Sequence, residues 1–210
     1  MTRPIVRSFN ARFVSAAAAH VRAGGHAVVW EAPRRARLYF PRPADGDESD
    51  LGWWAVLDLG KLRWDLATRA PFRGLGTALV PRAQNDIVAR WIERDSAWPG
   101  TTRTVAFDCL ACGACCRDNF VTLLAPDVER FVAAGRADLT RPPLARKKNG
   151  KLSLVLLRSK DCRFLGEDNR CGIYTIRPDA CSEFPVGSEC CLYAREEELG
   201  LYDGLAPAGS

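Results

Sequence analysis

The chain has 210 residues, of which 47% are hydrophobic, so it holds enough apolar material for one large domain or two small ones. No stretch approaches the roughly 20 consecutive apolar residues of a membrane-spanning helix, and the arginines Arg3, Arg7 and Arg12 interrupt what would be a secretion signal. The composition argues against whole-chain disorder, a membrane span and secretion. It predicts a cytoplasmic protein.

The net charge of +5 is confined to the N-terminal half. Residues 1–108 hold 16 Lys and Arg against 11 Asp and Glu, whereas residues 109–210 hold 14 of each. An excess of this size is weak for nucleic-acid binding, in which basic residues usually cluster on one face. The charge therefore argues against a nucleic-acid partner, and the run Arg146-Lys147-Lys148 is interpreted as a solvated turn.

The N-terminal half predicts an antiparallel meander flanked by helices. A helix is expected over 11–22, because the segment is rich in alanine, which favours helices, and the glycines at 24 and 25 would end it. Runs of β-branched and aromatic residues predict strands over 26–32, 35–42, 52–59 and 61–68, with an acidic loop at 43–50. Apolar residues at helical spacing predict a second helix over 83–97.

The C-terminal half predicts short elements separated by loops. A strand over 104–108 leads into the first cysteine, and a helix over 125–136 begins near Pro126. The turn Asn149-Gly150 predicts a hairpin within 141–161, and Arg177-Pro178 starts a short helix over 177–184. The fold class expected for the whole chain is α+β.

Tryptophan and cysteine divide the chain into two regions. All six tryptophans precede residue 99, and all nine cysteines lie between 109 and 191. We expect an α+β region of unknown role at 1–106, a cysteine-cluster domain at 107–201 and a tail at 202–210. The N-terminal region could bind another protein.

Four thiols within eight residues form the strongest chemical signal. Cys109, Cys112, Cys115 and Cys116 are spaced so that successive sulfurs can turn toward one metal ion, and Gly113 lets the backbone curl between them. Nine cysteines in a reducing cytosol favour metal ligation or redox chemistry over disulfides. The alternative, a set of small buried apolar side chains, does not explain this spacing.

Further thiols follow at larger intervals. They are Cys162, Cys171, Cys181, Cys190 and Cys191. Neighbouring side chains on an extended segment point apart, so one of the last two could be a spare. The only histidines, His20 and His26, are far from the cysteines in sequence and are interpreted as structural.

Residues 107–201 resemble the YkgJ-like CxxCxxCC cysteine-cluster family, described as zinc- or iron-chelating domains. Its opening cluster corresponds to Cys109, Cys112, Cys115 and Cys116. Its second signature corresponds to Cys171, Ile173-Tyr174, Arg177-Pro178, Cys181 and Phe184-Pro185, with Cys162 before it. Relatives also favour Cys191 over Cys190. The resemblance thus implies eight metal ligands: Cys109, Cys112, Cys115, Cys116, Cys162, Cys171, Cys181 and Cys191.

The metal and the activity stay open at the level of sequence. Three cysteines at two-residue intervals favour an iron–sulfur cluster such as 4Fe-4S, whereas Cys116 directly after Cys115 departs from the ferredoxin pattern and leaves zinc open. The function expected is metal binding. The alternatives are electron transfer or metal delivery, and an S-adenosylmethionine-dependent protein lysine N-methylase, which some relatives suggest. Arg177 could neutralise thiolate charge.

Overall fold

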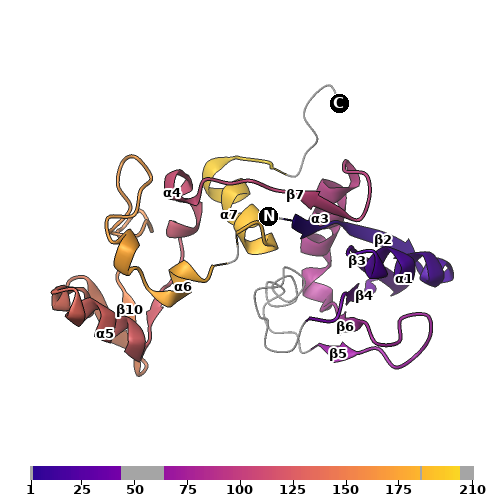
Figure 1. Cartoon of the computed structure of the whole chain (residues 1–210), viewed down its shortest axis with the longest axis horizontal. Helices are drawn as coiled ribbons and strands as arrows, with labels where there is room; N and C mark the ends of the chain where they lie inside the picture. Colours follow the sequence, from indigo (N-terminus) through magenta and orange to yellow (C-terminus); the bar gives the residue numbers. More distant parts are fainter. Residues whose placement is uncertain (1, 44–63, 185, 204–210) are drawn as a thin grey trace. The chain divides into compact units, whose positions relative to one another are not determined.

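The computed structural model describes residues 2–43, 64–184 and 186–203. The chain divides into two compact units (Figure 1). Unit 1 comprises 1–106, 187–193 and 202–210, and unit 2 comprises 107–186 and 194–201. Helix α7, Glu189–Leu199, therefore contributes its first residues to unit 1 and its later residues to unit 2.

Unit 1 is built on a five-stranded mixed sheet with strand order β2-β3-β4-β6-β5. Its strands are β2 Val6–Asn10, β3 His26–Ala32, β4 Arg35–Phe40, β6 Gly76–Leu79 and β5 Asp65–Leu66. Helix α1, Val14–Arg22, connects β2 to β3, and this crossover makes the two strands parallel. The other neighbouring strands are antiparallel.

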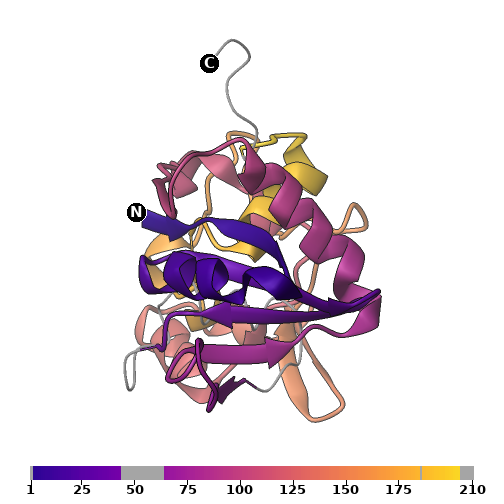
Figure 2. The ribbon, with the colours of Figure 1, turned by 90° about the vertical axis from the view of Figure 1, so that its right-hand side faces the viewer.

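Apolar clusters cover both faces of this sheet. Successive residues of a strand point to opposite faces, so Val28 packs in the cluster with Trp91 of α3, Asn85–Ser96, and Val29 packs in the cluster with Val21 of α1. Figure 1 shows the strands between α1 and α3, and in Figure 2 α1 lies in front of the sheet. A separate two-stranded sheet pairs β1, Thr2–Pro4, with β7, Thr102–Thr104.

A buried cluster of charges completes unit 1. Arg3, Asp95 and Glu189 are 2%, 0% and 3% exposed. The Arg3 guanidinium donates to Asp95 Oδ2 at 3.0 Å and to Glu189, which also accepts from Arg94. Buried charges must be paired, and this pairing fixes segment 187–193 to unit 1.

Unit 2 has short elements and a smaller apolar core. Its sheet has the order β8-β10-β9. The elements are α4 Cys109–Cys112, β8 Thr122–Leu123, α5 Ala125–Ala133, β9 Ala145–Lys148, β10 Lys151–Leu154 and α6 Asp179–Ser182. Phe131 and Leu139 are fully buried in the apolar core of unit 2.

The described residues of both units also form short 3-10 turns. These are η1 Ala11–Phe13, η2 Arg82–Gln84, η3 Ala114–Cys116, η4 Ala137–Thr140 and η5 Tyr174–Ile176.

The α+β class is confirmed, together with most predicted elements. These are the helices over 11–22, 83–97, 125–136 and 177–184, the strands over 26–32 and 35–42, and the hairpin within 141–161. The antiparallel pairing predicted for this half is correct from β3 onward, but the order is not a simple meander, because β4 pairs with β6 rather than with β5. β2 is not among the predicted strands and is parallel to β3. No helix in the described ranges is long and apolar enough to cross a membrane.

The strand predicted over 104–108 is wrong. β7 ends at Thr104, which pairs with Thr2, and residues 105–108 are in neither a helix nor a strand. The strand over 52–59 lies outside the described residues, as do most of the loop at 43–50 and the first residues of the strand over 61–68. Within the described residues 64–68, Asp65 and Leu66 form a strand.

The buried charge cluster generates a stability prediction. Glu189→Gln removes a carboxylate's charge and leaves Arg3 and Arg94 buried, so unfolding of unit 1 should become easier by about 3–5 kcal/mol. The control Glu31→Gln breaks the more exposed pairs with Arg35 and Arg37 and should cost less than about 1 kcal/mol. Urea unfolding followed by tryptophan fluorescence measures both. Equal costs would contradict the prediction.

The same carboxylate predicts an acid-sensitive contribution to stability. Burial alone would raise the pKa of Glu189, but the charges of Arg3 and Arg94 outweigh burial and lower it below its ordinary value of 4.5. The pairing therefore stabilises the fold above about pH 4.5 and is lost as the pH falls through the lowered pKa. Urea unfolding at pH 7 and pH 3 should show a smaller cost of Glu189→Gln in acid.

Candidate metal centre

The first cysteine segment is a single helical turn followed by a reversal of the chain. Asp108 caps α4 by accepting from the Leu110 N–H at 3.0 Å. Gly113 then adopts φ 65°, which ends α4 and starts the 3-10 turn that carries Cys115 and Cys116. Cys109 and Cys112 thus lie on α4, and Cys115 and Cys116 lie on the 3-10 turn that follows it.

Gly113 is required by conformation and by space. A left-handed φ is costly for residues with a side chain. A Cβ at this position would also lie 3.0 Å from Leu165 Cδ1 and 3.1 Å from Asn169 Cβ. The second cysteine loop therefore packs directly on the backbone of the first.

Backbone hydrogen bonds join the second cysteine loop to the first. The Cys162 N–H donates to the Cys116 carbonyl at 2.8 Å. Arg117 Nη1 donates to Asp161 at 2.8 Å, and its Nη2 donates to Asn169 at the same distance. These bonds hold both ends of the loop that begins at Cys162 against the first segment.

A narrow hairpin-like loop then brings Cys171 back toward Cys162. Leu165 and Cys171 form an isolated bridge, and the Gly172 N–H donates to the Phe164 carbonyl at 2.7 Å. An open cavity of about 430 Å³ lies against this loop. Arg136, Arg163 and Cys171 are among the residues that line it, so solvent and small ions can approach the loop beside Cys171.

Cys181 lies on α6, whose start is fixed by a buried carboxylate of α5. Asp127 is 0% exposed, and its Oδ1 accepts from the Asp179 N–H at 2.8 Å. Arg130 pairs with Asp179 at 2.8 Å and donates to the Arg177 carbonyl at 3.1 Å. Two side chains of α5 thus determine where α6 presents Cys181.

Electrostatic interactions identify the thiols that lie close together. The Cys116 thiol donates to Cys115, and this bond lowers the pKa of Cys115 to about 7 and raises that of Cys116. Burial raises the pKa of Cys181 to about 12, with added repulsion from Cys162, Cys115 and Cys171. Cys115, Cys116, Cys162, Cys171 and Cys181 therefore form one group, here called the five-thiol cluster.

The other two cysteines of the opening motif border this cluster. Burial raises the pKa of Cys109, and the charges of Cys115 and Cys112 raise it further. Cys112 Sγ accepts a hydrogen bond from Arg195 Nη1 at 2.8 Å, and the same guanidinium lies 4.3 Å from the Phe107 ring centroid. Arg195 is thus held over an aromatic ring with its charge directed at a sulfur.

Arg177 lies close enough to the thiols to influence their ionisation. The hydrogen bond from Cys116 lowers the pKa of Cys115, and the charge of Arg177 lowers it further. For Cys181, burial raises the pKa more than the charge of Arg177 lowers it. Its guanidinium lies 3.7 Å from the Tyr174 ring centroid, and its Nη1 donates to the Tyr174 carbonyl at 3.2 Å. Tyr174 therefore positions a cation beside the thiols.

The last two cysteines lie in unit 1. Cys190 and Cys191 follow Glu189 on α7, and Cys191 is 9% exposed, with its backbone N–H donating to Ser188 Oγ at 3.2 Å. All nine cysteines are in the described part of the chain, and none is in a disulfide. His20 and His26 are also in unit 1, where His20 bonds the Ile5 carbonyl.

The donor chemistry fits a soft metal, but the thiols are not yet at bonding distances. Thiolates are the preferred ligands of zinc and of iron–sulfur clusters. Within 2–43, 64–184 and 186–203, no three His, Cys, Asp or Glu side chains stand close enough to hold one ion. The hydrogen bond to Cys115 and burial raise the pKa of Cys116, and burial raises that of Cys181, whereas a bound cation would stabilise both groups as thiolates.

Several positioning residues were missed in the sequence. Asp127 and Arg130 are separated from Cys181 by about fifty residues, and nothing local marks them as its supports. Arg117 and Asn169 are ordinary polar residues of loops. The i,i+3 spacing of Asp127 and Arg130 indicates only a pair on one helix face, which the structure contains.

Comparison with known proteins gives a match over this region. Residues 108–200 match the family model CxxCxxCC, described as "Putative zinc- or iron-chelating domain". No curated protein and no solved structure matches the chain.

A pair of glycine substitutions tests how strongly the cysteine loops depend on Gly113. Gly113→Ala should lower thermal stability and metal retention, because it adds strain at φ 65° and a contact with Leu165. Gly135→Ala is the control, since Gly135 has φ 72° but open space around its Cα. We expect about 1–3 kcal/mol for Gly113→Ala beyond the cost of the control. Equal costs would show that the loops do not pack as described.

Proposed function

We propose that residues 108–200, a domain of the CxxCxxCC family of zinc- or iron-chelating domains, bind a metal centre through cysteine thiolates alone. The five-thiol cluster would supply the central ligands: Cys115, Cys116, Cys162, Cys171 and Cys181. Cys109 and Cys112 would extend it. Cys191 is included among the ligands because of the resemblance.

One observation carries the proposal. Three chain segments that are remote in sequence place thiols within electrostatic reach of one another. Burial raises the pKa of Cys181 and the hydrogen bond to Cys115 raises that of Cys116, with smaller contributions from neighbouring thiols. A bound cation would instead favour the thiolate forms, and Arg177 already supplies one positive charge nearby.

The spacing of the first three cysteines favours an iron–sulfur centre as the first candidate. A single zinc ion and a single iron–sulfur cluster each take four protein ligands, so the count of thiols does not separate them. The run Cys109, Cys112, Cys115 has the two-residue spacing of ferredoxin ligands. The hydrogen bond from Arg195 to Cys112 Sγ is of the kind that tunes thiolate-ligated iron.

Zinc is the second candidate, and the Cys115-Cys116 pair favours it. In the ferredoxin run the fourth cysteine comes three residues after the third and precedes proline. Here Cys116 adjoins Cys115 and is followed by Arg117. A zinc ion would stabilise a scaffold domain, whereas an iron–sulfur cluster would transfer electrons.

In either case the centre would stabilise unit 2. From 155 to 173 the described chain contains no helix or named strand, and turns, isolated bridges and single hydrogen bonds hold it. Binding to thiolates from three segments would close these loops, so metal binding and folding would be coupled. Reduced thiols in this number suit the cytoplasm, which we propose as the location.

Elemental analysis of protein purified without oxygen tests the proposal. The parent chain should contain tightly held iron with acid-labile sulfide, or zinc without sulfide. Cys115→Ser and Cys181→Ser should each lose most of this metal and destabilise unit 2. Cys190→Ser is the matched control, because the resemblance favours Cys191 over Cys190 as a ligand, and it should retain the parent's metal.

The outcomes separate the candidates. Iron and sulfide in comparable amounts, with a brown colour that bleaches on reduction, would support the cluster. Colourless protein with zinc would support the scaffold. Unchanged metal content in Cys181→Ser would remove this thiol from the ligands, and a parent chain without metal would overturn the proposal.

A further inference from the structure

The small sheet of unit 2 has two chemically different faces. In β10, Leu152 and Leu154 alternate with Lys151 and Ser153, and successive strand residues point to opposite sides. Leu154 pairs with Ala145, and all three belong to or pack against the apolar core of unit 2. The face carrying Lys151 and Ser153 is therefore the solvent face.

Register places three cations on this solvent face. Lys148 is directly opposite Lys151, and Arg146 is directly opposite Ser153. All three cations are exposed. None of them pairs with a carboxylate among the residues that the structure describes. By contrast, Lys160 pairs with Asp118, and Arg117 pairs with Asp161.

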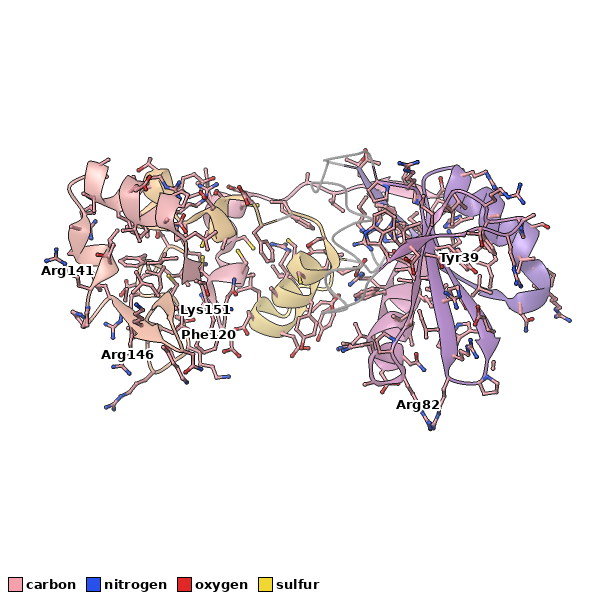
Figure 3. All side chains as sticks on the ribbon, turned by 90° about the horizontal axis from the view of Figure 1, so that it is seen from below. Tyr39, Arg82, Phe120, Arg141, Arg146 and Lys151 are labelled. Atoms are coloured by element: carbon pink, nitrogen blue, oxygen red, sulfur yellow. The ribbon has the colours of Figure 1, made fainter. Side chains whose placement is uncertain are left out.

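An aromatic ring and two hydroxyls belong to the same face. Thr122 of β8 pairs with Ser153, and Phe120 lies two residues before Thr122, so both point to the solvent side. Val121 between them is 7% exposed, which agrees with this alternation. Phe120 is 77% exposed, and the register that pairs Thr122 with Ser153 continues past Ser153, away from Lys151, toward Phe120. Figure 3 labels Phe120, Arg146 and Lys151 in the same unit.

The stability of the hairpin does not explain this arrangement. Like charges directly opposite on neighbouring strands are destabilising, and Lys148 faces Lys151. The turn Asn149-Gly150, with φ values of 51° and 79°, already suits a tight hairpin without any need for lysines. A large apolar ring in water likewise contributes nothing to folding.

We propose that this basic face, formed by Phe120, Thr122, Arg146, Lys148, Lys151 and Ser153, binds single-stranded nucleic acid. Cations would contact successive phosphates, the Phe120 ring would stack on an unpaired base, and the hydroxyls would bond sugar or phosphate oxygens. An exposed aromatic ring on an open sheet face suits a single strand, because bases in a duplex are stacked on each other and offer no free face. The inference is independent of the proposed metal centre.

The net charge of the C-terminal half concealed this face. Residues 109–210 are neutral overall, and the run Arg146-Lys147-Lys148 alone is interpreted as a solvated turn. In the folded hairpin the three residues of this run lie on two faces of the sheet. Arg146 and Lys148 share the solvent face with Lys151, whereas Lys147 pairs with Leu152 on the other face. The positive charge becomes local only in the folded sheet.

Fluorescence anisotropy with a labelled twelve-nucleotide oligouridylate and the full chain tests the proposal. Binding should weaken about tenfold between 50 and 150 mM salt, as expected for about three phosphate contacts on a single strand. Lys148→Glu or Lys151→Glu should weaken binding and flatten this salt dependence. Phe120→Ala should weaken binding at least about fivefold, with little change in salt dependence.

Lys147→Glu is the matched control, because it changes the net charge equally in the same hairpin but on the opposite face. It should bind nearly as well as the parent. An equal loss in Lys147→Glu and Lys148→Glu would overturn the proposal, since only net charge would then matter.

Two further probes exclude other polyanions. The same oligonucleotide paired with its complement should bind more weakly than the single strand, and vesicles containing phosphatidylserine should not compete with it. Tighter binding to the duplex or to the vesicles, no effect of Phe120→Ala, or no binding at 50 mM salt would each overturn the inference. Unchanged thermal unfolding of each variant confirms that the fold is intact.

Discussion

The hydrogen bond from the Cys162 N–H to the Cys116 carbonyl, 2.8 Å long, is the contact on which the cysteine site depends. It joins two segments that are 46 residues apart (162 − 116) and that share no regular sheet or helix. Arg117 strengthens the junction through Asp161 and Asn169, and the absence of a side chain at Gly113 lets the second loop approach. Without this junction the thiols after residue 160 would have no fixed relation to the opening motif.

The two units stabilise themselves in different ways. Unit 1 has a sheet covered by apolar side chains on both faces and a buried charge cluster in which Arg3 and Glu189 are paired. Unit 2 has one small core and a long stretch of loop whose thiols repel one another once ionised. Metal binding would stabilise this stretch, because thiolates from separate segments would bind one centre and hold the segments together.

The sequence predicted those features that depend on local pattern. Helix α1 follows from its alanines and glycine stop, the β9-β10 hairpin follows from Asn149-Gly150, and the opening thiols follow from their spacing. Features that depend on distant pairing were missed. β2 becomes a strand by pairing in parallel with β3, Asp127 supports Cys181 from another helix, and the basic face exists only when β9 and β10 align. Local pattern carries no information about which remote segments meet, which is why the ligand types were predictable and their supports were not.

X-ray absorption spectroscopy of the metal in the intact, anaerobically purified protein measures the ligand shell directly. A centre built from the cysteines of unit 2 requires a shell of sulfur atoms at about 2.3 Å, with additional iron scatterers if the centre is an iron–sulfur cluster. Nitrogen or oxygen ligands at about 2.0–2.1 Å as the main shell would contradict a thiolate-only centre, because they would assign the metal to side chains other than the cysteines that the fold gathers.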